Sequence, residues 1–133
     1  MTFRFFWDPG STGNARPQPA ATSSIFLKTP SWQGKWAAAY ILGVQSQGVG
    51  TSLKHYAANN QEFERRSTSS NLDERTLREL YLPAFEIAVK EAQPWSVMAA
   101  YNPVNHMHAT ENILLLQDIL RTQWGFEGFV VSD

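Results

Sequence analysis

The sequence of 133 residues contains no cysteine, which excludes disulfide bonds and thiolate metal sites. Charged residues are also few and balanced in sign: they make up 17% of the sequence, the net charge is -1, and the basic residues form no continuous stripe. Nucleic-acid and membrane-surface partners are therefore disfavoured. The apolar stretch after Met1 is interrupted by Arg4 and Asp8, and it is too short for a signal sequence or a membrane span. We therefore expect a soluble, cytoplasmic protein.

The composition changes near Gly34. Residues 9–33 are rich in Pro, Gly, Ser, Thr and Ala and show no hydrophobic period, whereas residues 34–133 are strongly patterned. A hydrophobic content of 43% is sufficient for a packed core. We expect residues 1–33 to be irregular and residues 34–133 to form part of one domain.

Within residues 34–133, helical and strand patterns alternate. Helices are predicted over 36–47, from the N-cap Asp73 onward with a break at Pro83, and from Thr110 to about Trp124. Strands are predicted over 51–55, 95–100 and 129–132, with loops over 56–72 and 101–109. This order predicts an α/β fold with parallel strands, either a partial (β/α)8 TIM-type barrel or an open doubly wound sheet.

Three-to-four-residue spacing predicts the buried face of the two later helices. The inward residues are expected to be Leu77, Leu80, Tyr81, Ala84, Phe85 and Ala88 in one, and Ile113, Leu116, Ile119 and Leu120 in the other. Tryptophans 36, 95 and 124 lie away from the carboxyl ends of the predicted strands, so we interpret them as packing residues rather than sugar platforms.

Polar side chains follow the apolar part of each predicted strand. They are Lys54 and His55, then Tyr101 and Asn102, then Ser132 and Asp133. Sites in α/β folds assemble at the carboxyl ends of parallel strands, where such groups could bind sugar hydroxyls and a carboxylate could act as nucleophile, base or metal ligand. On spacing alone, a solvated Lys54, a core His55 and a turn at Asp133 are equally acceptable.

Long motifs distinguish these readings. KHYAANNQE, DERTLRELYLPAF, VMAAYN and WGFEGFVVSD closely resemble the N-terminal barrel domain of family 3 glycoside hydrolases over about residues 34–133. The resemblance implies a retaining β-glucosidase-like hydrolase with a small carbohydrate substrate and neither cofactor nor catalytic metal. It makes Asp133 the nucleophile, assigns Lys54 and His55 to the hydroxyls of the terminal sugar, and assigns Met98 and Tyr101 to the wall of that subsite.

The first motif also narrows the subclass. The text after His55 resembles two-domain β-glucosidases, and it lacks the P-G-H-G text of members that cleave N-acetylglucosamine linkages. The resemblance places the acid/base glutamate of the two-domain branch in a later domain, beyond Asp133. Because a full barrel needs about 250 residues, we expect a truncated and inactive fragment. A non-catalytic sugar-binding module is the alternative.

Residues 10–33 do not resemble the text that the family has at this point. One possible coding of the family text N-F-E-Y-F-S-E-D-P, read one nucleotide late, translates to residues 22–30 of this sequence. Our hypothesis is that residues 10–33 are an out-of-frame translation that removes a substrate-contacting arginine of the family.

Three further features receive a structural interpretation. The charged residues Glu62, Glu64, Arg65 and Arg66 are expected to form a solvated rim. His106 and His108 are expected to be loop residues rather than metal ligands. A doubly wound nucleotide-binding domain is disfavoured because no glycine-rich phosphate loop follows a predicted strand.

Overall fold

The computed structural model describes residues 2–4, 29–60, 63–64 and 66–133, so most of the proposed out-of-frame segment lies outside the described residues. Its main feature is a parallel sheet of order β1-β2-β3-β6. The strands are β1 (Thr2–Arg4), β2 (Ser52–Tyr56), β3 (Ser96–Ala99) and β6 (Phe129–Ser132). A small antiparallel hairpin follows β3, formed by β4 (Pro103–Val104) and β5 (Met107–His108).

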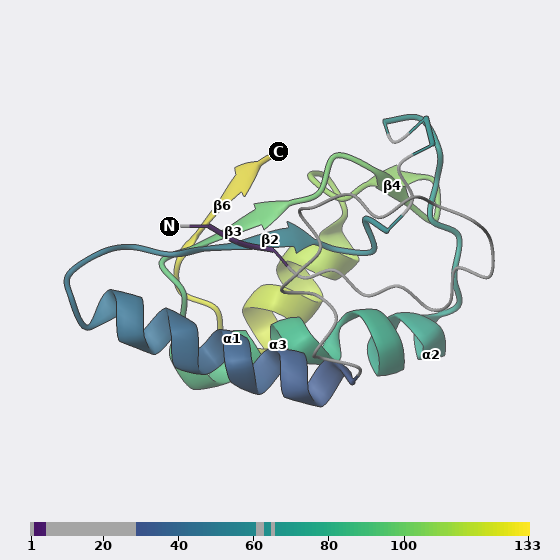
Figure 1. Ribbon diagram of the computed structural model, residues 1–133. Helices are drawn as coiled ribbons and strands as arrows, with labels where there is room; N and C mark the ends of the chain where they lie inside the picture. Colours follow the sequence, from purple (N-terminus) through teal and green to yellow (C-terminus); the bar gives the residue numbers. More distant parts are fainter. Residues whose placement is uncertain (1, 5–28, 61–62, 65) are drawn as a thin grey trace, which may run out of the picture.

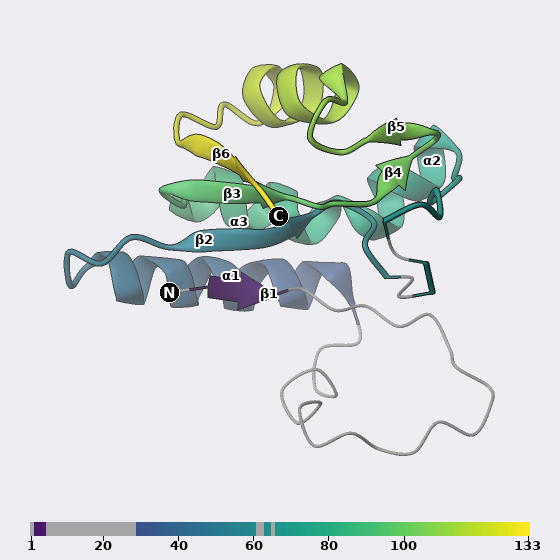
Figure 2. The ribbon, with the colours of Figure 1, turned by 90° about the horizontal axis from the view of Figure 1, so that it is seen from above.

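The helices are α1 (Pro30–Gln45), α2 (Glu74–Thr76), the π-helical turn η1 (Leu77–Tyr81), α3 (Pro83–Ala92) and the π-helix η2 (Leu114–Gln123). Figures 1 and 2 show α1, α3 and η2 on the same face of the sheet. Helices on one face favour barrel winding, because doubly wound sheets have helices on both faces. The predicted parallel α/β architecture is confirmed, and its completion into a barrel stays a prediction.

The core lies between the sheet and these helices. Leu53 of β2 pairs in register with Val97 of β3, which pairs with Val130 of β6. Leu53 and Val97 are fully buried, and Val130 packs against the core. Because side chains alternate across a strand, the neighbours of these three residues face the side of the sheet opposite the helices, where polar groups can be presented to a ligand. The register of β2 shifts between Leu53 and Tyr56, so His55 does not follow the alternation that starts at Leu53.

Helix α1 begins earlier than the sequence pattern predicted. Thr29 is its N-cap, since the Thr29 hydroxyl oxygen accepts a hydrogen bond from the Trp32 amide, and Pro30 occupies the first turn. The helix and strand β1 thus extend regular structure into the segment 1–33 that was expected to be irregular.

The helix after Asp73 is divided as predicted. Asp73 is the N-cap of α2, and its pKa is lowered because the Thr76 backbone amide and then the Thr76 hydroxyl donate hydrogen bonds to its carboxylate. Pro83 begins α3 as a separate helix. The predicted inward face is correct at Leu77, Ala84, Phe85 and Ala88, but Leu80 is 40% exposed.

The last helix departs most from its prediction. Ile113 is 68% exposed, whereas Leu115, which the pattern left out, is fully buried beside Ile119 and Leu120. Ile113 lies before the first residue of η2, so it does not belong to the face that Leu115, Ile119 and Leu120 bury. Asn112 caps the helix by accepting a hydrogen bond from the Leu115 amide, in place of Thr110.

The three tryptophans differ in how far they are buried. Trp124 is buried with 6% exposure and packs edge-on to Tyr56. Trp95 is 52% exposed before β3, but its ring lies against Gly50, where an added Cβ atom would approach it to 2.6 Å. Trp36 is 57% exposed on α1. None of the helices in the described part of the chain is long and apolar enough to cross a membrane.

Candidate active site

The carboxyl ends of β2, β3 and β6 lie side by side at one edge of the sheet (Figure 1). Ala99 of β3 pairs with Tyr56 on one side and with Ser132 on the other. The backbone amide of Asp133 donates to the carbonyl of Ala99 at 3.2 Å. This ladder fixes the position of Asp133 at the edge of the sheet, next to the loop that begins with Tyr101.

Three predicted site residues come together at this edge. The Nε2 atom of His55 lies 3.4 Å from Oδ2 of Asp133, and the rings of His55 and Tyr101 are 6.3 Å apart between centroids. The side chain of His55 is 11% exposed and that of Asp133 is 22% exposed, so both are partly shielded from water. Their roles in binding and catalysis stay predictions.

The other two predicted residues lie on the same strands. Lys54 is half-buried on β2 in register with Arg4 of β1, and Met98 is half-buried on β3 in register with Val131 of β6. Their assignment to hydroxyl binding and to the subsite wall also stays a prediction.

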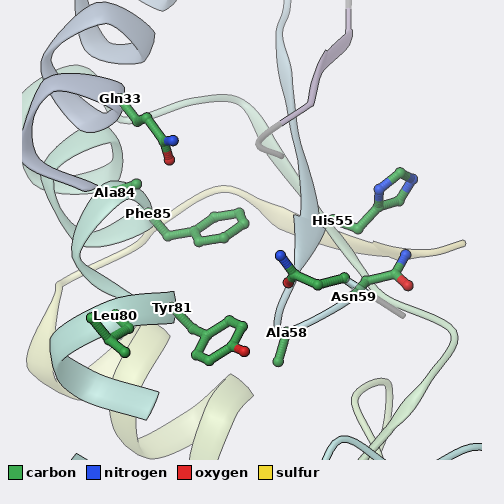
Figure 3. Close-up of a pocket in the computed structure, with 9 residues that line it drawn as sticks. Gln33, His55, Ala58, Asn59, Leu80, Tyr81, Ala84 and Phe85 are labelled. Carbon is green, nitrogen blue, oxygen red and sulfur yellow. The ribbon is translucent and has the colours of Figure 1, made fainter. Parts of the chain in front are cut away.

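A small cavity lies on the helix side of His55. Its volume is about 30 Å³, which is room for one water molecule and too little for a sugar ring. Figure 3 shows Tyr81 and Phe85 directed toward the end of β2, whereas the ring of His55 extends to the other side of that strand. The lining residues are Gln33, His55, Ala58, Asn59, Asn60, Leu80, Tyr81, Ala84 and Phe85. A sugar would therefore have to bind on the open side of the sheet, where the His55 ring lies.

The buried side chain of Asn102 connects two loops next to the site, a role that was not predicted from the sequence. Asn102 is 2% exposed, and its amide donates to the Ala58 carbonyl, the Ser70 hydroxyl and the Pro103 carbonyl at 3.2–3.4 Å. The hydroxyl of Ser70 also donates to the Ala58 carbonyl, at 2.8 Å. Asn102 thus ties the loop after His55 to the loop after Tyr101, although its buried Oδ1 has no hydrogen-bond partner among the described residues. The sequence feature that could have indicated this role is the Tyr101-Asn102 pair at the end of β3.

The hairpin after β3 borders the same edge. A ring nitrogen of His108, Nδ1, lies 3.2 Å from the Tyr101 carbonyl. No group of three His, Asp or Glu side chains in the described residues is arranged to bind a metal ion. The groups that converge are an imidazole, a phenol and a carboxylate. They can bind the hydroxyls of a neutral polar ligand, and the carboxylate can attack an electrophilic carbon or accept a proton.

Comparison with known proteins agrees with this chemistry. Residues 12–133 match the model of the glycosyl hydrolase family 3 N terminal domain, a match that begins well before residue 34. The chain is 48% identical over 125 residues to thermostable beta-glucosidase B of Acetivibrio thermocellus, covering 94% of this chain and 17% of that protein. It is 47% identical over 125 residues to an exo-alpha-(1->6)-L-arabinopyranosidase of Bifidobacterium breve, covering 94% of this chain and 16% of that protein.

Solved structures give the same result. Beta-glucosidase 3B from Thermotoga neapolitana in complex with glucose superposes with a TM-score of 0.80 and 49% sequence identity. The superposition covers 85% of this chain and 16% of that one. The chain therefore spans only about a sixth of the length of the proteins that it resembles.

Proposed function

Because the chain belongs to glycosyl hydrolase family 3, we propose that it derives from a retaining, exo-acting β-glycosidase whose substrate is a terminal β-glucoside or a related sugar. The observation that supports this most directly is the Asp133 carboxylate at the end of a parallel strand, 3.4 Å from His55. The relatives include a beta-glucosidase and an arabinopyranosidase. The class of reaction is thus better supported than the identity of the sugar.

In the proposed reaction, an oxygen of Asp133 attacks the anomeric carbon, the bond to the leaving group breaks, and a covalent glycosyl ester forms. Water then hydrolyses this ester, so the configuration at the anomeric carbon is retained. Lys54 and His55 bind hydroxyls of the terminal sugar, and Met98 and Tyr101 border its ring. These assignments place all five residues around one sugar ring at the sheet edge described above.

The leaving group needs a proton from a second carboxyl group. In retaining enzymes the two carboxyl groups are about 5–5.5 Å apart, and none of the resemblances assigns the acid to a residue of this chain. General acid catalysis typically contributes about 10²–10⁴-fold to the rate. We therefore expect negligible hydrolysis of an unactivated aryl β-glucoside by the 133-residue polypeptide.

The assignment of Asp133 can be tested without a general acid. A dinitrophenyl deoxyfluoro-β-glucoside has a leaving group that departs as a stable anion, and its fluorine slows hydrolysis of the ester. Incubation with the purified chain should add one fluoroglucosyl group, which peptide mapping by mass spectrometry should locate on Asp133. The Asp133→Asn variant, which keeps the size of the side chain, should remain unlabelled.

Two other outcomes carry a different meaning. Labelling at another residue would contradict the role of Asp133. Saturable glucose binding without any labelling would favour the alternative, a sugar-binding module that has no catalytic step.

We also propose that residues 10–33 are an out-of-frame translation of family text. The family model matches residues 12–133, which include most of this segment. The protein sequence therefore does not decide whether the reading frame is shifted, and the coding DNA is needed. A single-base shift across this window should restore a G-R-N-F-E-Y-F-S-E-D-P text and its arginine. If no shift restores that text, the proposal is wrong.

A further inference from the structure

The contact between His55 and Asp133 spans an intervening strand. His55 belongs to β2 and Asp133 follows β6, while β3 lies between them. Neighbouring strands are about 4.8 Å apart, so the two backbones are separated by about 10 Å. The 3.4 Å separation of Nε2 and Oδ2 therefore requires both side chains to extend over β3 toward each other.

We infer that His55 is a positioning residue for the Asp133 carboxylate, an inference that rests on the proposed function of Asp133. A carboxylate only accepts hydrogen bonds, so the Nε2 atom that faces it has to bear the proton. With Oδ2 held by this N–H group, the carboxylate loses one rotation, and Oδ1 remains as the oxygen that attacks. Orientation of this kind lowers a reaction barrier because the reacting atom is already in place.

This role differs from the one that the resemblance implies. If the Nε2 proton is engaged by Asp133, only Nδ1 of His55 remains for any other partner. In that case Nε2 contacts the Asp133 carboxylate, and Nδ1 is the nitrogen that could contact a sugar hydroxyl. Lys54, the neighbouring residue on β2, would be the main hydroxyl donor of the pair.

Several described residues lie around His55. Asp133 approaches from β6, Tyr101 from the loop after β3, and Lys54 is adjacent on the same strand. On the helix side, Tyr81 and Gln33 line the small cavity with His55. Asp133 is the acidic side chain that the described residues bring within 4 Å of the His55 ring, and an acid at this distance favours the protonated imidazole.

The inference can be tested by titrating the imidazoles of the 133-residue chain by NMR. The chain has three histidines, and the His55→Gln variant identifies the signals of His55. Replacing Asp133 by Asn should lower the titration midpoint of the His55 ring by about one pH unit. The midpoints of His106 and His108 should stay the same. Asp133 is the last residue of the chain, so its α-carboxylate is present in both proteins and the change reports the side chain alone.

Two further measurements make the result unambiguous. The Asp133→Glu variant retains the charge, so its His55 titration midpoint should shift much less than that of Asp133→Asn. The nitrogen chemical shifts of His55 above its midpoint should show the proton on Nε2. An unchanged midpoint in Asp133→Asn, or a proton on Nδ1, would overturn the inference.

These outcomes are separate from those of the fluorosugar experiment. Loss of labelling with an intact coupling would reject the function of Asp133 while the contact stands. Labelling without coupling would reject the positioning role alone.

Discussion

The hydroxyl of Tyr56 donates a hydrogen bond of 2.9 Å to the backbone carbonyl of Leu115, which connects the end of β2 to helix η2. Tyr56 is fully buried, and its ring packs edge-on to Phe85 and Trp124. Since Tyr56 directly follows His55, this bond fixes the part of β2 that presents the candidate site.

Removing this hydroxyl should destabilise the fold. The Tyr56→Phe variant keeps the ring contacts but leaves the Leu115 carbonyl without this donor, at a cost of about 1–2 kcal/mol in the free energy of unfolding. Urea denaturation followed by circular dichroism measures the change. An unchanged free energy of unfolding in Tyr56→Phe would contradict the importance of the buried bond.

The same residue should make stability depend on alkaline pH. Burial raises the pKa of Tyr56 far above its ordinary value of 10.0, an effect that the nearby Arg78 guanidinium opposes only in part. Above pH 10 the unfolded chain loses this proton while the folded chain keeps it, so the folded state becomes less stable as the pH rises.

The slope should be about 1.4 kcal/mol for each pH unit. The contribution of Tyr56 is full below pH 10 and falls from there upward. Urea midpoints measured between pH 9 and pH 11 should therefore decline less in Tyr56→Phe than in the unaltered chain. Parallel declines would show that Tyr56 ionises in the folded state.

The order of the elements could be predicted from the sequence because strands and helices differ in hydrophobic period. The strand predicted over 129–132 is β6 itself, and the break at Pro83 is where α3 begins. The face of η2 could not be predicted in this way. The start of the helix decided the error, since Ile113 precedes η2 and is exposed, whereas Leu115 lies inside η2 and is buried.

The candidate site was predictable for a related reason. Parallel strands bring their carboxyl ends to one edge, so His55, Tyr101 and Asp133 had to approach each other once the strands were neighbours. The buried role of Asn102 was not predictable, because the residue also follows a strand end. Whether such a side chain faces the ligand or the protein depends on the loops that cover it, and residues 63–72 show no period.

The hairpin between β4 and β5 has two turn residues with positive φ, Asn105 at 50° and His106 at 70°. Glycine is preferred at the second of these positions, since a side chain there is strained. His106 is exposed, and its backbone amide, which donates to the Ser69 hydroxyl at 2.8 Å, would persist in a variant. His106→Gly should therefore stabilise the chain by about 1 kcal/mol, measured as a higher midpoint of urea denaturation.

Asn105 provides the matched control, because its side chain does more than occupy a turn. Its amide donates to the Leu72 carbonyl at 3.0 Å, and its Oδ1 accepts from the Leu72 amide at 2.9 Å. Asn105→Gly should lose both bonds and destabilise by about 1 kcal/mol although the φ of the residue is also positive. Stabilisation by both glycine variants would show that backbone strain alone matters in this turn.

Two glycines on helix α1 should respond to alanine in opposite directions. A Cβ atom at Gly34 would lie 2.7 Å from Cβ of Ile87 and 3.0 Å from the Ala84 carbonyl oxygen, so α1 and α3 would have to separate. Gly34→Ala should cost about 1–3 kcal/mol through this overpacking. At Gly43 no atom lies within 4 Å of the added Cβ, and the gain in helix propensity should stabilise the chain by about 0.5–1 kcal/mol. Because the two variants make the same chemical change in one helix, the difference between their urea midpoints isolates the contact with α3. Two stabilised variants would mean that α1 does not pack against α3 through Gly34.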